Sequence, residues 1–134
     1  MKAENLMLGD YVYLIDPDTK GRTIVQVTQV DMTDSMAHYF SPIPLTPELL
    51  EKNGFREWRG EDCEWRYERL YWGTGVHVVV SKNEPCEKAG VRISIDLGEP
   101  KWGAWHALNL YNKQYVHEFQ HALKLCGIEE KIII

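Results

Sequence analysis

Apolar and polar residues alternate with a period of two along much of the chain, and this pattern predicts β-strands. The alternating runs are rich in β-branched and aromatic residues, and clusters of Gly, Pro, Asn and Asp separate them. Residues 31–44 are more polar and irregular, which favours a loop. Strands are expected over residues 10–15, 23–30, 64–72, 76–80, 91–97 and 105–111, with a closing edge strand at 131–134. Short turns between them favour mostly antiparallel sheets.

A short helix is predicted over residues 47–53. Thr46 can cap its first turn, and Pro47 suits the first helical position because its missing N–H is not needed there. Asn53 and Gly54 supply the chemistry of a helix end. This helix carries no candidate catalytic group, so we expect its role to be structural.

A longer amphipathic helix is predicted over residues 112–126, with Asn112 as its cap and Gly127 just past its end. Its apolar residues recur at steps of three and four and form one stripe: Tyr115, Val116, Phe119, Ala122, Leu123 and Cys126. Two helices combined with antiparallel strands predict an α+β fold.

The length of 134 residues predicts one domain with its own core. Within it we expect a β-hairpin region over residues 1–42, then the short helix, a β-meander and the terminal helix over residues 43–134. The Leu8-Gly9-Asp10 start followed by a hairpin is similar to the opening of SH3-like barrels. An ordinary hairpin in an open sheet is the alternative.

Composition narrows the functional classes. The net charge of −5 argues against a general nucleic-acid or membrane-surface binder, because phosphates attract the opposite sign. Cys63, Cys86 and Cys126 are odd in number and far apart, which favours reduced thiols over a disulfide framework. The first residues lack the apolar core of a signal peptide, and no apolar run is long enough to span a bilayer. A cytoplasmic protein is therefore expected.

The segment His117-Glu118-Phe119-Gln120-His121 matches the H-E-x-x-H pattern of zinc peptidases. Histidines four apart on a helix can reach one ion, and Glu118 could then activate the bound water as general base. The thirteen residues that follow His121 offer Cys126, Glu129 and Glu130 as a third ligand, but these lie closer than the usual downstream ligand. At about 100° per residue, both histidines lie roughly 170° from the middle of the apolar stripe, so we expect them to face solvent. The sequence thus favours no metal ligand and no catalytic residue, and a small zinc-dependent hydrolase is the alternative.

Residues 56–72 combine arginines with aromatic residues, a composition that can bind single-stranded nucleic acid by stacking and phosphate contacts. Five acidic residues in the same segment neutralise the arginines locally. Alternation places Trp65, Tyr67 and Tyr71 on one side of a strand, where they can pack in a core. Nucleic-acid binding through this segment is an alternative that the sequence does not favour.

Three stretches resemble small uncharacterised proteins from phages and mobile elements of Bacteroides-type gut bacteria. They are residues 1–13 apart from Glu4 and Asn5, residues 42–55 and residues 115–121, about a third of the chain. The resemblance implies a family of unknown function. In that family the last stretch reads Val-His-Gln-Leu-Gln or Val-His-Glu-Leu-Gln, often with Asn at the position of His121. A complete H-E-x-x-H at residues 117–121 would then be incidental to the shared fold.

The favoured function is a non-enzymatic accessory protein of phages or mobile elements that acts as a protein-interaction module. No cofactor is expected, and zinc belongs to the hydrolase alternative only. The aromatic residues and the apolar Ile132-Ile133-Ile134 end could form a surface for a protein partner or for self-association. No membrane partner is expected.

Overall fold

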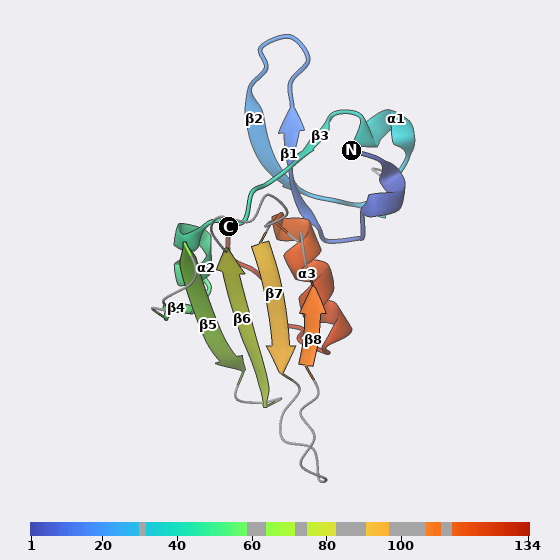
Figure 1. The fold of residues 1–134 in the computed structure, drawn as a ribbon. Coiled ribbons are helices and arrows are strands. Elements are labelled where there is room, and N and C mark those ends of the chain that lie inside the picture. The colour runs from blue at the N-terminus through green and yellow to red at the C-terminus, as the bar shows by residue number, and fades with distance from the viewer. Residues whose placement is uncertain (30–31, 59–63, 72–74, 83–90, 97–106, 111–113) are drawn as a thin grey trace. The chain divides into compact units, whose positions relative to one another are not determined.

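A computed structural model describes all residues except 30–31, 59–63, 72–74, 83–90, 97–106 and 111–113 (Figure 1). Backbone contacts divide the chain into two compact units. Unit 1 comprises residues 1–44 and 115–121, and unit 2 comprises residues 45–114 and 122–134. The first part of the terminal helix therefore belongs to unit 1 and its last part to unit 2.

Unit 1 contains a three-stranded antiparallel sheet in the order β2-β1-β3. Its strands are β1 (Tyr11–Ile15), β2 (Arg22–Gln26) and β3 (Phe40–Pro42). The Asp16 carboxylate closes the β1–β2 turn by accepting hydrogen bonds from the N–H groups of Asp18 and Thr19. These local bonds lower the pKa of Asp16. The predicted hairpin is confirmed, although β2 ends at Gln26, earlier than predicted. The described strands do not close into a barrel.

The core of unit 1 includes one side of this sheet and two short helices. The helices are η1 (Ala3–Asn5) and α1 (Asp34–Ala37). Buried residues of this core are Leu6, Val12, Val27, Ala37 and Phe40. The loop predicted over residues 31–44 is therefore wrong in part, because α1 and β3 both lie in it. Thr33 caps α1 by accepting a hydrogen bond from the Met36 N–H, and burial of Ala37 and Phe40 fixes the segment.

Unit 2 contains a five-stranded antiparallel sheet in the order β4-β5-β6-β7-β8. The strands are β4 (Arg56–Glu57), β5 (Trp65–Tyr71), β6 (Val76–Lys82), β7 (Val91–Asp96) and β8 (Ala107–Leu110). Each strand pairs with its neighbour in sequence, as a meander does. Two antiparallel sheets with a few helices confirm the predicted α+β class.

One face of β5 and β6 is buried. Tyr67, Tyr71, Val76, Val78 and Val80 alternate inward along the two strands. Helix α2 (Pro47–Lys52) packs on this side, where the Tyr67 hydroxyl donates a hydrogen bond to Glu51 over 3.1 Å. Thr46 and Pro47 begin the helix as predicted, and Asn53 ends it. Gly54 has a φ of +81°, a conformation that favours glycine, and it turns the chain so that Phe55 is buried.

The terminal helix, α3 (Val116–Leu125), is shorter than predicted. Tyr115 forms an isolated β-bridge with Pro44, and the Val116 N–H donates to the carbonyl of Ile43, so the chain is extended there. Asn112, the predicted cap, lies outside the described residues. The predicted edge strand at residues 131–134 is wrong, because this segment has no strand geometry. In its place, the Asn53 side chain binds the backbone of Ile133.

Candidate functional site

The predicted exposure of His117 is wrong. Its side chain is buried, with 5% of the residue exposed, and its ring lies parallel to that of Tyr115 at 6.0 Å between centroids. Residues 115–116 are extended and pair with Ile43 and Pro44, just after β3, within unit 1. The stacked Tyr115 ring helps to bury the His117 side chain, although the helical wheel places it opposite the apolar stripe.

His121 is also engaged with the protein. Its Nε2–H donates to both carboxylate oxygens of Asp10, at 2.9 and 2.8 Å, and Asp10 is only 1% exposed. Gln120, next to it, accepts a hydrogen bond from the Tyr11 N–H and donates one to the Gly9 carbonyl. The second half of the H-E-x-x-H segment therefore anchors α3 to the start of β1. These bonds all lie within unit 1.

The geometry assigns the histidine pair a structural role. The Nε2 atom of His121 binds the Asp10 carboxylate, and the rings of His117 and His121 stand edge to face with centroids 5.8 Å apart. Glu118 is half-buried beside them. In the part of the chain that the structure describes, no three His, Cys, Asp or Glu side chains are grouped so that they could hold a metal ion. A zinc centre needs at least three such donors.

We expect protein purified without a histidine tag to carry less than one equivalent of zinc, because Asp10 satisfies His121 without a metal. Elemental analysis after dialysis against zinc at neutral pH measures this. One tightly held equivalent that disappears in both His117→Ala and His121→Ala would contradict the structural role and restore the hydrolase alternative.

The predicted nucleic-acid segment uses its aromatic and arginine residues within the protein. Arg66 lies over the Trp58 ring with 4.3 Å to the centroid, and Arg69 lies over Tyr71 at 4.2 Å. Tyr67 and Tyr71 are buried, so their faces do not form a platform for bases. Residues 59–63 and 72 of this segment lie outside the described part of the chain.

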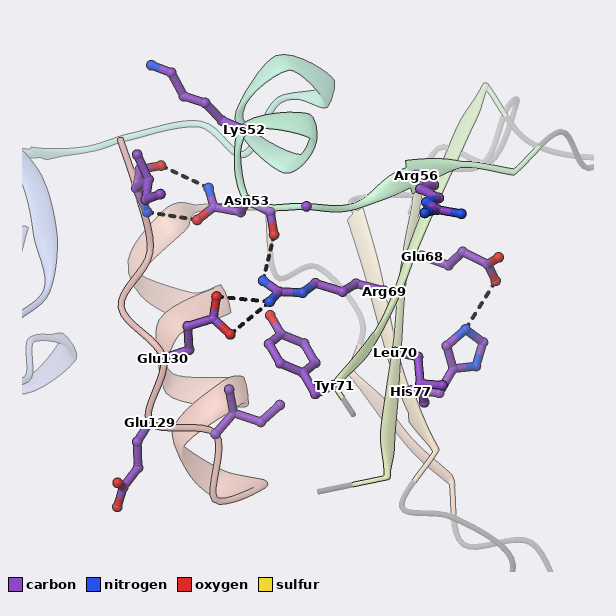
Figure 2. Close-up of a pocket in the computed structure, with 13 residues that line it drawn as sticks. Lys52, Asn53, Arg56, Glu68, Arg69, Leu70, Tyr71, His77, Glu129 and Glu130 are labelled. Carbon is purple, nitrogen blue, oxygen red and sulfur yellow. Dashed lines mark hydrogen bonds and ion pairs between the residues drawn. The ribbon is translucent and has the colours of Figure 1, made fainter. Parts of the chain in front are cut away.

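A groove of about 830 Å³ lies beside β5 in unit 2 (Figure 2). All of its lining residues belong to this unit. They come from the end of α2, from β4, from the last part of β5, from the start of β6 and from the segment that follows α3. Leu70 and Ile133 add exposed apolar surface to the groove.

Arg69 holds the two sides of the groove together. Its guanidinium donates to the Asn53 carbonyl at 2.7 Å and to both carboxylate oxygens of Glu130 at 2.9 and 2.8 Å, as Figure 2 shows. On the other side of β5, Glu68 pairs with His77 at 3.1 Å. Burial raises the pKa of the Tyr71 phenol, which stays neutral near pH 7.

The Asn53 side chain acts as a backbone partner for the C-terminal segment. Its amide nitrogen donates to the Ile133 and Leu49 carbonyls, both at 2.8 Å, and its oxygen accepts from the Ile133 N–H at 2.7 Å. The side chain thereby supplies both hydrogen bonds that a neighbouring strand would give to Ile133. It fixes one wall of the groove.

Replacing Asn53 with alanine is expected to cost roughly 2–3 kcal/mol of unfolding free energy, because three hydrogen bonds to a buried side chain are lost together. Hydrogen exchange should become much faster at the Ile133 amide, while the amides of β6 change little. Asn53→Asp is the matched variant, since it keeps the acceptor for Ile133 N–H and loses both donors. Unchanged exchange at Ile133 in Asn53→Ala would contradict the anchoring role.

Among the described residues, only β4 pairs along the outer edge of β5, and the pairing is short. β4 pairs with β5 only at Arg56–Glu68 and Glu57–Tyr67, and the Trp58 N–H donates to the Arg66 carbonyl. In an antiparallel strand, the N–H and C=O groups of every second residue point to the same side. Those of residues 66 and 68 face β4, so those of Leu70 face that side too. No described strand continues this pairing beyond Glu68. The N–H and C=O of Leu70 therefore point into the groove.

Three charged side chains on the groove rim are exposed: Lys52 at the end of α2, Arg56 in β4 and Glu129 after α3. Within the described part of the chain, none of these three side chains forms an ion pair. Arg56 lies directly opposite Glu68 in the sheet, so positive and negative side chains are mixed along the rim.

Sequence reasoning missed the groove. It treated Asn53 only as a helix end and Arg69 as one of several arginines in the segment 56–72. Arg69 and Glu130 are 61 residues apart, and no local pattern links them. The sequence offered only the strand predicted over residues 64–72, and the short β4 beside it became evident only in the structure.

No protein-family model, curated protein or solved structure matches the chain significantly. Among the described residues, no helix is long and apolar enough to cross a bilayer.

Proposed function

We propose that the protein is a non-enzymatic protein-binding module that works in the cytoplasm, and that the groove beside β5 in unit 2 is its binding site. An accessory role in a phage or mobile element remains the proposal that the sequence resemblance suggests. The observation that carries the binding proposal is a groove of about 830 Å³ beside β5, at an edge where no described residue pairs with the backbone of Leu70. Unpaired strand edges are the part of a sheet that most readily binds another chain.

The side chains of the groove support recognition more than catalysis. Arg69 is paired with Glu130, and Glu68 contacts His77, so these side chains are engaged with one another. Cys126, in the same unit, is half-buried, and burial raises the pKa of its thiol. A thiol with a raised pKa is a poor nucleophile. The exposed Leu70 and Ile133 instead provide apolar contact area, as binding surfaces do.

Site-specific photo-crosslinking tests the proposal. A photoreactive amino acid at position 133, which is 60% exposed in the groove, should give crosslinked protein adducts in a lysate of the host cell. The matched control is the same amino acid at position 125, which is 76% exposed and does not line the groove. Leu70→Lys should reduce the adducts formed from position 133.

Adducts with a host or phage protein would support binding of a partner, and adducts between two copies of this chain would assign the groove to self-association. Equal adducts from positions 133 and 125, or adducts that persist unchanged in Leu70→Lys, would refute the groove as the binding site. Mass spectrometry of the adducts identifies the contact residues.

A further inference from the structure

Asn53 and Gly54 form an Asn-Gly pair, a sequence in which the asparagine side chain reacts readily with its own backbone. The nitrogen of the following residue attacks the side-chain carbonyl carbon, and glycine has no side chain to hinder this approach. In this protein the pair lies at the end of α2, where both residues line the groove beside β5. The pair is therefore a candidate for spontaneous covalent modification.

The hydrogen bonds of the Asn53 side chain block this reaction in the closed structure. Figure 2 shows the Asn53 amide turned toward the segment that follows α3, and the residue is only 8% exposed. Its nitrogen donates to the carbonyls of Leu49 and Ile133, and its oxygen accepts from the Ile133 N–H. All three bonds must break before the amide can turn toward the Gly54 nitrogen.

The backbone at the end of α2 blocks the reaction as well. The Gly54 N–H donates to the Glu51 carbonyl at 3.1 Å, so the attacking nitrogen is engaged in the last turn. Asn53 has a ψ of 18°, which places the Gly54 nitrogen away from the Asn53 Cβ atom across the Cα–C bond. Closure of a five-membered ring requires these two atoms to lie on the same side. Reaction therefore needs a local opening in which the end of α2 rotates and the segment at Ile133 detaches.

We propose that Asn53 is a modification site that reacts when the segment at Ile133 detaches from α2, and that the product holds this segment less tightly afterwards. The Gly54 nitrogen bonds to the Asn53 Cγ atom, the Cγ–Nδ2 bond breaks, and the amide leaves as ammonia with the proton of the Gly54 N–H. Water then adds to either carbonyl of the cyclic imide and opens it, which gives aspartate or isoaspartate at position 53. This proposal goes beyond the binding function and does not depend on it.

Both products oppose the original contacts. Each replaces the amide nitrogen with a carboxylate oxygen, so the Leu49 and Ile133 carbonyls lose their donor and face a negative charge. Isoaspartate also adds one methylene group to the main chain, next to the Asn53 carbonyl that Arg69 binds. Because the ammonia is lost, the change is not reversed when the segment returns. The reaction therefore loosens one wall of the groove permanently.

The first measurement compares the folded chain with an unfolded reference. The full chain and a synthetic peptide of residues 49–57 are incubated at neutral pH, and mass spectrometry follows conversion of the Asn53 amide to an acid. Conversion should be at least about tenfold slower in the protein than in the peptide, because each event waits for local opening.

Two variants at position 133 test whether this segment controls the reaction. Ile133→Pro removes the N–H that is bonded to Asn53 and should accelerate conversion at least about tenfold relative to the wild type. Ile133→Ala is the matched control, because it keeps the backbone groups and shortens a side chain that is 60% exposed. Its conversion rate should stay within about twofold of the wild type.

Hydrogen exchange separates local opening from loss of the fold. The amides of β6 should keep their protection in Ile133→Pro. Wild-type protein modified at Asn53 can be isolated by anion exchange through its added negative charge. Its Ile133 amide should exchange faster than in the unmodified protein, while the β6 amides remain unchanged.

Conversion in the folded wild type as fast as in the peptide would overturn the proposal, as would equal rates in Ile133→Pro and Ile133→Ala. Unchanged Ile133 exchange after modification would refute the effect of the product. If Ile133→Pro loses β6 protection, the wild type is measured across low urea concentrations instead. Its conversion rate should then follow exchange at Ile133, and a rate that follows β6 exchange would mean reaction only from the unfolded chain, against the proposal.

Discussion

Replacing Phe119 with alanine is expected to reduce the free energy of unfolding by roughly 3–5 kcal/mol. Phe119 has no exposed surface and is the largest of the fully buried side chains among the described residues. Removing its ring loses burial of apolar area and leaves a cavity that surrounding residues fill only in part. Small domains have a total stability of about 5–15 kcal/mol, so the change brings the protein close to unfolding at room temperature.

Urea denaturation followed by circular dichroism measures this effect, and Leu125→Ala is the matched control in the same helix. Leu125 is 76% exposed, so its truncation should change stability by no more than about 0.5 kcal/mol. A loss below about 1 kcal/mol in Phe119→Ala would show that α3 does not pack as the structure describes.

The periodicity of apolar residues predicted the elements that bury only one of their faces. β5 alternates as expected, with Tyr67 and Tyr71 inside and Leu70 outside. The start of α2 could be predicted equally well. The Thr46 side chain accepts a hydrogen bond from an N–H of the first turn, and Pro47 has no N–H that needs a partner. These features depend on residues that are close in sequence, and such features can be read from one chain.

The surroundings of the histidines could not be read in this way. A helical wheel places His117 opposite the apolar stripe, yet the residue is buried because the chain at residues 115–116 pairs with the β3 region. The partner of His121 is Asp10, which lies 111 residues earlier. Local pattern shows which face of a helix is apolar, but it does not show how many neighbours surround the helix.

The groove escaped prediction for the same reason. Its walls are joined by Arg69 to Glu130 and by Asn53 to Ile133, and both links cross at least 61 residues of sequence. The apolar end Ile132-Ile133-Ile134 suggested an edge strand because β-branched residues favour strands. In the structure, the side-chain amide of Asn53 binds Ile133 as a partner strand would. Strand propensities do not predict such a contact.

Replacing His121 with alanine is expected to cost roughly 3–5 kcal/mol, because it leaves the Asp10 carboxylate buried without its main partner. Asp10 is 1% exposed and would retain the bond from the Met7 N–H at 2.8 Å. Asp10→Asn alone should cost less, about 1–3 kcal/mol, because it removes the charge together with the strong hydrogen bond.

The stability of the double variant distinguishes a structural pair of His121 and Asp10 from a metal site. Asp10→Asn added to His121→Ala should restore stability by about 1–2 kcal/mol, since a buried neutral amide costs less than a buried unpaired carboxylate. Denaturation of all four proteins gives the coupling directly. If His121 served a metal instead, its removal would lower zinc affinity, and Asp10→Asn would bring no recovery of stability. A double variant less stable than His121→Ala would therefore contradict the structural role of this pair. A recovery of stability would show that His121 serves to anchor α3, which would explain the H-E-x-x-H match.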